Sequence, residues 1–178
     1  MKGILLIQAG YMQDADRKVY SLLSTLSNEE REAERGSYYG SLSGLARHIL
    51  GGTLYFHSMF KAALKENPAA VKALSYPAAA LPEGKLTEAQ WKNLESLFES
   101  GNGATIQFVS ALKDTELNTP VPVEWYGGNP AAVPLYFMFN NLFVHGLHHR
   151  GQISQILDEL KVDNDYSGID VAFLKLVH

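Results

Sequence analysis

Apolar residues recur at steps of three and four along four stretches of the chain, which is the period of an amphipathic helix. This pattern predicts long helices over residues 3–26, 41–64, 87–112 and 132–160. The rest of the chain contains no convincing run of strands. Four long amphipathic helices predict an all-α protein, a four-helix bundle.

Local signals support the helix boundaries. Ser41 is a residue type that caps helix N-termini, and residues 87–90, Thr-Glu-Ala-Gln, have the form of a capping box. Gly101 and Gly103 favour a break in the third helix. The apolar period nevertheless stays roughly in phase across them, so we expect one continuous helix over residues 87–112.

The segments outside the helices differ in length and character. Residues 27–36 are charged and end in glycine, which is typical of a connection. Three prolines within residues 68–82 indicate a long, mostly irregular crossover between the second and third helices. Residues 119–130 are turn-rich and extended, and a small hairpin is one form they could take. The apolar residues at 171–177 predict a short C-terminal helix that packs on the bundle.

Composition narrows the classes of function. The 178 residues include no cysteine, which excludes disulfides, thiolate metal sites and a cysteine nucleophile. The formal charge of -4, with scattered Lys and Arg, argues against a nucleic-acid partner. No apolar run is long enough for a signal peptide or a membrane span, so we expect a cytoplasmic protein with no membrane partner. Without internal repeats or composition shifts, we expect a single domain over residues 1–178.

Candidate chemistry concentrates in residues 145–152, His-Gly-Leu-His-His-Arg-Gly-Gln, which hold three of the six histidines. At about 100° per residue, His145 and His149 lie on one helix face, with Cβ atoms roughly 5–6 Å apart. Two imidazoles at this spacing can bind one divalent metal ion. The same side carries three more polar side chains: Asn141, His148 and Gln152. This polar stripe on a mostly apolar helix would be costly to bury without partners.

A third metal ligand must come from another helix, because bundles build metal sites from facing helices. His48 and His57 are nine residues apart and point to opposite sides of the second helix, so only one can face the site. We choose His48, because Gly51 and Gly52 lie one turn on and would leave space above the metal. Three histidines with one open position are typical of a catalytic zinc site. The alternative is that the histidines only form hydrogen bonds and the glycines only allow close helix packing.

These residues resemble a known family. Residues 145–152 closely resemble the His-x-x-x-His-Arg-Gly-Gln signature of the DinB-like superfamily, four-helix-bundle proteins related to bacillithiol and mycothiol transferases. Residues 36–50 are similar to the family's second-helix motif with its ligand histidine, and residues 11–17 are similar to its opening helix. The resemblance covers nearly the whole chain. It implies a bundle with a long crossover, a bound zinc or nickel ion, and a homodimer.

Carried over residue by residue, the family's metal triad falls on His48, His145 and His149. The family often has an acidic residue where this chain has Thr53, which should not reach the metal. It often has Asn where this chain has Val144, so a specific substrate cannot be inherited.

The resemblance favours a divalent-metal-dependent enzyme of thiol S-transferase type, with zinc expected first and nickel next. Because the chain has no cysteine, the nucleophile would be a low-molecular-weight thiol acting on a second small molecule. A metal-dependent hydrolase and a non-catalytic metal- or ligand-binding protein remain alternatives. We expect His148, Gln152 and Asn141 to hold a ligand histidine or to contact substrate. We expect Arg150 to form an ion pair with a neighbouring helix.

Overall fold

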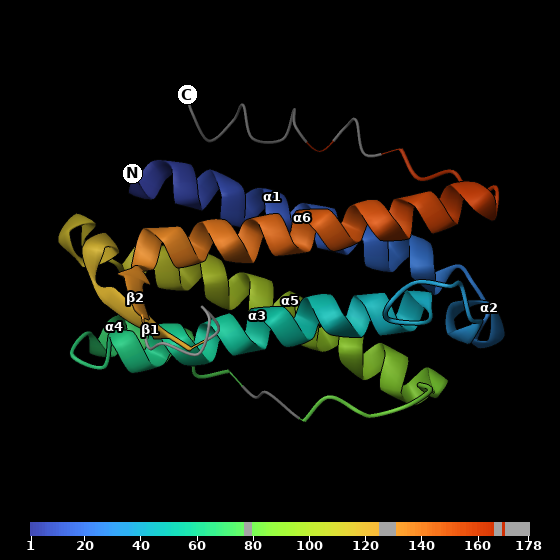
Figure 1. Ribbon diagram of the computed structural model, residues 1–178, viewed down its shortest axis with the longest axis horizontal. Helices are drawn as coiled ribbons and strands as arrows, with labels where there is room; N and C mark the ends of the chain where they lie inside the picture. Colours follow the sequence, from blue (N-terminus) through green and yellow to red (C-terminus); the bar gives the residue numbers. More distant parts are fainter. Residues whose placement is uncertain (77–79, 125–130, 166–168, 170–178) are drawn as a thin grey trace.

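The protein is described by a computed structural model that covers residues 1–76, 80–124, 131–165 and 169. Its main elements are four long helices: α1 (Lys2–Ser24), α3 (Leu42–Ala63), α5 (Glu88–Ala111) and α6 (Leu135–Glu159). The predicted four-helix bundle is therefore confirmed (Figure 1). The C-terminal helix expected at residues 171–177 lies outside the described residues.

The long helices run in an up–down–down–up order. Figure 1 shows α1 and α6 running in one direction along the bundle, and α3 and α5 running in the other. Both α1 and α3 pack against α5 and against α6, so α1 and α3 occupy diagonal corners. Because α3 and α5 are parallel, the connection between them, described for residues 64–76 and 80–87, returns along the bundle and forms the predicted crossover.

Two connections that were predicted to be irregular contain short helices. Residues 27–36 include α2 (Asn28–Glu32), and the crossover, expected to be mostly irregular, includes α4 (Pro68–Ala73). Each begins with a side-chain cap: Ser27 forms a capping box with Glu30, and Asn67 accepts a hydrogen bond from the backbone N–H of Ala70. These caps satisfy N–H groups that a short helix leaves without partners.

A small hairpin closes one end of the bundle. After the 3-10 helix η1 (Asp114–Asn118), β1 (Pro120–Val123) pairs antiparallel with β2 (Ala131–Pro134). The hairpin therefore extends beyond the expected residues 119–130, and α6 begins later than residue 132. The later start of α6 is explained by Pro134, because a proline disfavours helical backbone at the residue before it.

The third long helix is continuous through its glycines, as the apolar period predicted. Gly101 is buried, and a Cβ atom there would lie 3.3 Å from the hydroxyl of Tyr76 in the crossover. Glycine therefore allows the crossover to approach the helix closely, which explains its presence despite its low helix propensity.

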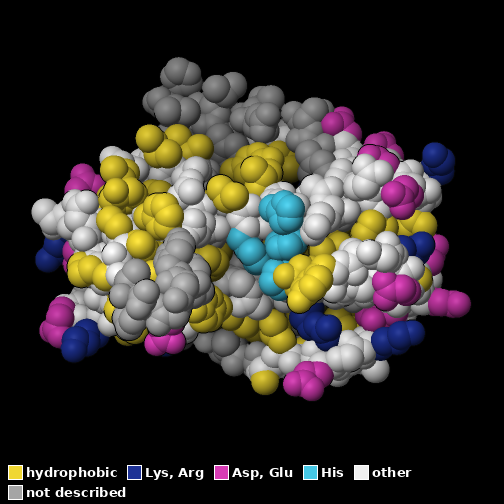
Figure 2. All heavy atoms as spheres, viewed as in Figure 1, with side chains coloured by type: hydrophobic (Ala, Val, Ile, Leu, Met, Phe, Trp, Pro, Cys, Tyr) yellow, Lys and Arg dark blue, Asp and Glu magenta, His cyan; other side chains and the backbone are white. Residues whose placement is uncertain are grey.

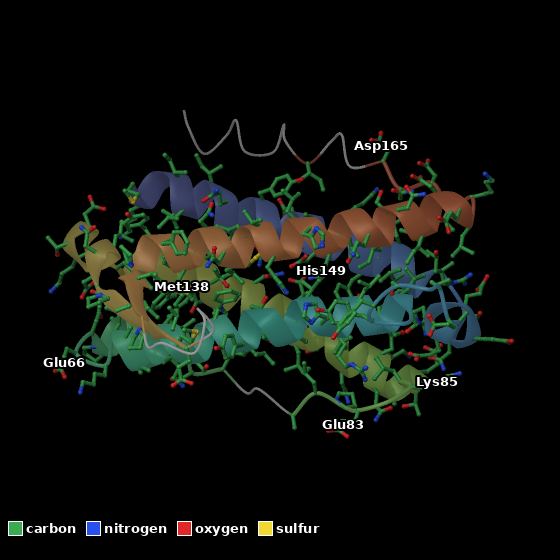
Figure 3. The ribbon with its side chains drawn as sticks, in the orientation of Figure 1. Glu66, Glu83, Lys85, Met138, His149 and Asp165 are labelled. Carbon is green, nitrogen blue, oxygen red and sulfur yellow. The ribbon has the colours of Figure 1, made fainter. Side chains whose placement is uncertain are left out.

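The apolar core consists of two clusters along the bundle axis. The cluster near the hairpin contains Phe60, Phe108 and Phe139, and the cluster at the opposite end contains Leu45 and Trp91. Between them lies a belt of buried polar side chains: Asp16, Thr53, Asn102, His149 and Arg150. Figure 3 shows His149 near the middle of the bundle, on the side of α6 that faces α3. Polar groups at this depth require partners, so the belt is where a functional site is expected.

Along the described part of the chain, no helix combines the length and apolar character needed to cross a membrane.

Candidate metal centre

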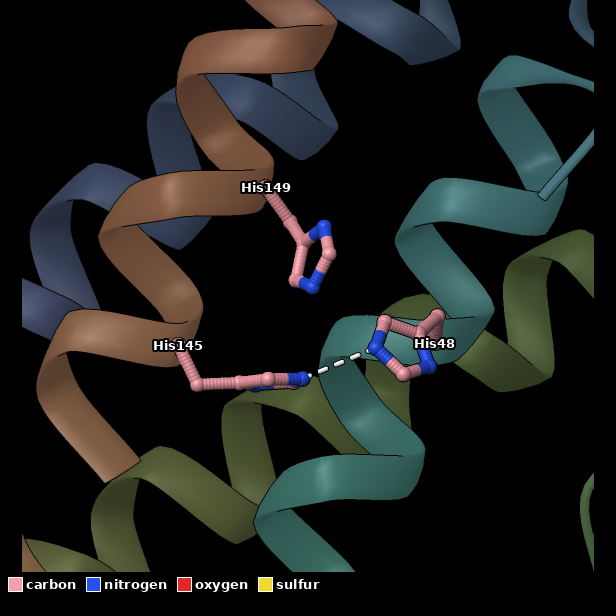
Figure 4. A group of neighbouring side chains, drawn as sticks. All are labelled: His48, His145 and His149. Carbon is pink, nitrogen blue, oxygen red and sulfur yellow. Dashed lines mark hydrogen bonds between the residues drawn. The ribbon is translucent and has the colours of Figure 1, made fainter. Parts of the chain in front are cut away.

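Three histidine rings from two helices converge at the polar belt. His48 projects from α3, and His145 and His149 project from successive turns of α6 (Figure 4). One ring nitrogen from each lies within 4.8 Å of the other two. The Nε2 atoms of His48 and His145 are 2.8 Å apart, so one of these rings donates a hydrogen bond to the other. The structure thus brings together the three side chains that helical spacing selected.

Gln152 fixes the ring of His149. The Nδ1 atom of His149 lies 2.7 Å from the side-chain oxygen of Gln152, one turn further along α6. An amide oxygen only accepts hydrogen bonds, so Nδ1 carries the proton and Nε2 keeps a free lone pair. Figure 4 shows this ring directed toward His48 and His145. Gln152 therefore prepares His149 as an Nε2 ligand, in the way that outer hydrogen bonds orient metal-binding histidines.

His145 lies directly against the backbone of α3. A Cβ atom at Gly52 would be 2.4 Å from Cε1 of His145, closer than real Cβ contacts come. At Gly51 the nearest atom would be a methyl carbon of Leu81 at 3.4 Å, an ordinary contact. Gly52 therefore makes room for the imidazole itself, whereas the sequence suggested that the glycines leave space above the metal.

Tyr39 covers the ring of His48. The two rings are stacked with centroids 3.7 Å apart and an interplanar angle of 18°. Gly36 and Gly40 turn the loop that carries Tyr39, with φ angles of 68° and 76° that favour glycine. Gly44 allows the loop to lie close, because a Cβ atom there would be 2.0 Å from the carbonyl oxygen of Tyr39. The sequence motif contained Tyr39, but its contact depends on loop geometry that spacing does not reveal.

The histidines of the group are held in their neutral form. Burial and, to a smaller extent, the neighbouring charge of His149 lower the pKa of His48 to about 4. Burial, with the neighbouring histidines, also lowers the pKa of His145 to about 4. The pKa of His149 is lowered by burial, and the hydrogen bond that its ring donates to Gln152 opposes this shift. Neutral imidazoles have the lone pairs that metal binding requires.

Two cavities lie near the histidine group, of which the first is lined by two of its members and the second by none. Histidine side chains appear at the surface in the centre of the face shown in Figure 2. The first, of about 430 Å³, is lined by His48, His145, Gly51, Gly52, Tyr55 and Phe56. The second, of about 460 Å³, lies between the loop before α3 and the C-terminal half of α6. A small molecule could therefore approach the histidines from solvent.

The other candidate residues take different places. His148 is exposed, lines the second cavity, and contacts the ring of His149 edge-on at a centroid distance of 4.8 Å. Gln152 lines the same cavity. Asn141 is half-buried one turn before His145, and it lines neither cavity.

His57 faces away from the group, as its spacing from His48 predicted. Its Nδ1 lies 3.0 Å from the hydroxyl of Tyr76, and its Nε2 lies 2.9 Å from the hydroxyl of Thr105. The Thr105 hydroxyl donates to the carbonyl of Gly101, so it accepts the Nε2 proton of His57. His57 therefore links α3, α5 and the crossover.

Arg150 forms the ion pair that was expected with a neighbouring helix. Its Nη1 atom lies 2.8 Å from Oδ1 of Asp16 in α1, and both side chains are buried. The side-chain amide of Asn102 in α5 donates to the other carboxylate oxygen at 3.0 Å. Burial raises the pKa of Asp16, while Arg150 and Asn102 oppose that rise. The sequence predicted that Arg150 faces a neighbouring helix, but it did not identify Asp16 and Asn102 as the residues of this network.

Comparison with known proteins gives one match. A family model described as the DinB family matches residues 5–163, a stretch that includes all four long helices from Leu5 onward and the three histidines. No curated protein and no solved structure matches the chain.

Proposed function

Because the chain belongs to the DinB family, we propose that His48, His145 and His149 bind one divalent metal ion and that the protein is a metal-dependent thiol S-transferase. The observation that carries this proposal is the convergence of three ring nitrogens beside an open cavity. Three neutral imidazoles suit zinc first and nickel next.

The residues present fit a metal ion. The three ring nitrogens lie within 4.8 Å of one another, and the lone pair of His149 Nε2 is left free by Gln152. The pKa values of about 4 for His48 and His145 mean that no proton competes with a cation at neutral pH. A group of three protein ligands would leave room for a substrate atom.

The composition of the chain favours a small-molecule thiol as nucleophile, because there is no cysteine to serve instead. A divalent metal ion at this site would lower the pKa of a bound thiol and stabilise its thiolate. The sulfur would form a bond to carbon of the electrophile, and the leaving group would depart with its bonding electron pair. Tyr55 and Phe56 give the first cavity an aromatic wall suited to an apolar electrophile.

A metal-dependent hydrolase is the second candidate enzyme. Hydrolysis needs a general base near the attacking water. Among the residues that line the two cavities, the one carboxylate is Glu159, and it accepts a hydrogen bond from Gln155 at 3.2 Å. We therefore place hydrolysis below thiol transfer. A non-catalytic metal- or ligand-binding protein is the remaining alternative.

Metal content tests the first part of the proposal. We expect protein purified without a histidine tag to hold about one equivalent of zinc or nickel by mass spectrometry. The double variant His145→Ala/His149→Ala should hold almost none. His148→Ala is the matched control, because His148 lies on the same helix turn but outside the group, and it should keep the metal. No metal in the wild type after incubation with zinc and nickel would overturn the proposal.

A transfer assay tests the second part. The metal-loaded protein is incubated with a panel of small thiols and alkyl or aryl halides, and the thioether product is followed by mass spectrometry. We expect product formation that a chelator abolishes and added metal restores. Metal binding without any thioether or hydrolysis product would instead favour the binding-protein alternative.

The cytoplasmic location and the homodimer expected from the sequence also stay predictions. Sedimentation equilibrium over a range of protein concentrations distinguishes a homodimer from a monomer.

A further inference from the structure

A groove runs along the seam between α1 and α6, on the face of α6 that points away from the histidine group. It consists of two neighbouring cavities, of about 380 and 180 Å³, that share Tyr11, Leu147 and Arg150. The larger cavity extends to Val144, and the smaller one extends to Ser154. Val144 and Leu147 have exposed fractions of 52% and 56%. A contiguous exposed apolar surface marks a place where another segment or molecule packs.

The walls of this α1–α6 groove are mostly apolar. Ile7 and Met12 come from α1, and Phe143 comes from α6. The charged side chain that lines both cavities is Arg150, and its guanidinium is already paired with the buried carboxylate of Asp16 at 2.8 Å. The groove therefore suits an apolar occupant better than an anion.

The chain turns back toward this groove after α6 ends. Lys161 has a φ of 60°, in the left-handed region that favours glycine. The N–H of Lys161 donates to the carbonyl of Asp158 at 3.1 Å, and the N–H of Val162 donates to the carbonyl of Leu157 at 2.9 Å. These two bonds form a Schellman motif, which ends the helix and reverses the chain.

Asn164 fixes the reversed chain at one end of the groove. Its side chain is buried against α6, where its amide donates to the Asp158 carboxylate at 2.7 Å and its oxygen accepts from the Ser154 hydroxyl. Ser154 itself lines the smaller cavity. Figure 3 shows Asp165 beside α6, back from the C-terminal end of that helix. The next residues of the chain therefore start at the groove.

These next residues match the groove in length and in apolar character. Residues 170–178 lie outside the described part of the chain, and six of the seven residues 171–177 are apolar. A helix advances about 1.5 Å per residue, so a helical chain would cover about 15 Å between residues 164 and 174. The same ten-residue step along α6 separates Ser154 from Val144. Residue 174 could therefore reach the far cavity.

The spacing of the apolar residues fits one face of such a helix. Ile169, Phe173 and Leu176 recur at steps of four and three, and Ile169, which is described, is half-buried. Because Asn164 holds the preceding chain at the groove, the local concentration of this segment would be on the order of millimolar. That tether favours the segment of the same chain over a second copy as the occupant.

We propose that residues 169–177 pack in the α1–α6 groove of their own chain, with Phe173 and Leu176 as the apolar anchors. The docked segment joins α1 to the outer face of α6, whose inner face carries His145 and His149. The occupant is a part of the chain itself, so the inference does not depend on a bound metal or on an enzymatic activity.

The absence of cysteine allows the groove to be probed with one introduced thiol at a time. Leu147→Cys places a thiol in the groove, and Ser58→Cys places one at an exposed position on α3, diagonal to α1. Each full-length variant is reacted with iodoacetamide, and alkylation is followed by mass spectrometry. Leu147 is exposed enough that its cysteine should react as fast as Ser58→Cys unless another segment covers it. We expect Leu147→Cys to react about tenfold more slowly.

Adding Phe173→Ser/Leu176→Ser removes the two anchors without changing the charge near the thiol. We expect this change to raise the alkylation rate of Leu147→Cys about tenfold and to leave that of Ser58→Cys unchanged. His178→Ser, a substitution beyond the anchors, should keep the protection. Equal far-ultraviolet circular dichroism of the variants checks that the bundle is intact.

Similar alkylation rates at the two positions with the natural C-terminal segment would overturn the inference. Protection that persists with Phe173→Ser/Leu176→Ser would overturn it as well, because another part of the molecule would then cover the groove. Protection that is lost on about a hundredfold dilution would assign the groove to a second copy of the chain. None of these results bears on the histidine group, which metal content tests separately.

Discussion

Gly52 sets the distance between α3 and the His145 imidazole. Because an added methyl group would lie 2.4 Å from the ring, Gly52→Ala must displace His145 from the other two histidines. We expect zinc affinity to fall about tenfold or more, equivalent to about 1.4 kcal/mol. Isothermal titration with zinc measures this change.

Gly51→Ala is a matched control on the same helix, since its methyl group would make only an ordinary contact with Leu81. Both substitutions raise helix propensity by a similar amount, about 0.5–1 kcal/mol. We therefore expect both variants to fold and Gly51→Ala to bind zinc normally. Equal zinc affinities for the two variants would show that His145 can move without cost, or that it is no ligand.

Gln152 makes a separate prediction about metal affinity. Replacing it with leucine removes the acceptor that holds the Nδ1 proton of His149, so either ring nitrogen can then carry the proton. We expect Gln152→Leu to weaken zinc binding by about tenfold, in the range found for such outer partners. Gln152→Glu keeps an acceptor oxygen and should bind zinc within a few-fold of the wild type.

Titration of zinc into both Gln152 variants, with ¹⁵N NMR of the histidine rings, checks the tautomer as well as the affinity. A leucine variant that retains wild-type affinity with an unchanged His149 tautomer would refute the role assigned to Gln152.

At the residue scale, the sequence predicted what helix periodicity controls. A spacing of four placed His145 and His149 together, and a spacing of nine separated His57 from His48. It could not predict the stacking of Tyr39 on His48, because that contact depends on a glycine-turned loop.

At the scale of elements, the long helices were predicted to within three residues because their apolar periods extend over many turns. The elements that differ from the prediction are short and have no extended apolar period. The sequence signals for α2 and α4 are their capping residues, Ser27 and Asn67. The extent of the hairpin depends on pairing between β1 and β2, which no local period records.

The buried ion pair links three of these helices and makes an element-scale prediction. Arg150→Met would leave the Asp16 carboxylate buried, with Asn102 as its one remaining side-chain partner among the described residues. Removing one partner of a buried pair costs about 3–5 kcal/mol. We expect a loss of about 3 kcal/mol in the free energy of unfolding of Arg150→Met, measured by urea denaturation.

The double variant Asp16→Asn/Arg150→Met removes both charges and should be more stable than Arg150→Met alone. This reversal follows because an unpaired buried charge costs more than two neutral side chains. If the second substitution instead lowers stability further, Asp16 contributes by some means other than its pair with Arg150.

At the scale of the whole molecule, a polar belt divides the apolar core into two clusters. Each long helix contributes to both clusters, so the belt cannot open without loosening packing on either side. This arrangement supports the histidine group on rigid helices rather than on loops, which is what a precise metal site needs. Because this packed core also buries titratable groups near the belt, the free energy of unfolding depends on their protonation state.

His57 shows this dependence most directly. Burial lowers its pKa from 6.5 to about 4, so the native state favours the neutral ring. The contribution of the neutral His57 ring to the free energy of unfolding is complete above pH 6.5. It is lost as the pH falls from 6.5 toward 4, because His57 takes up a proton in the unfolded chain before it does so in the folded protein. The shift corresponds to about 3 kcal/mol in total, of which about 2 kcal/mol is lost by pH 5.

His57→Gln isolates this effect, since glutamine does not titrate and its amide can still donate to Thr105 and accept from Tyr76. We expect urea unfolding of the metal-free protein to lose about 2 kcal/mol less between pH 7.5 and pH 5 in His57→Gln than in the wild type. Parallel curves for the wild type and His57→Gln would mean that His57 is protonated in the folded bundle, with water or a moved side chain reaching the space between α3, α5 and the crossover.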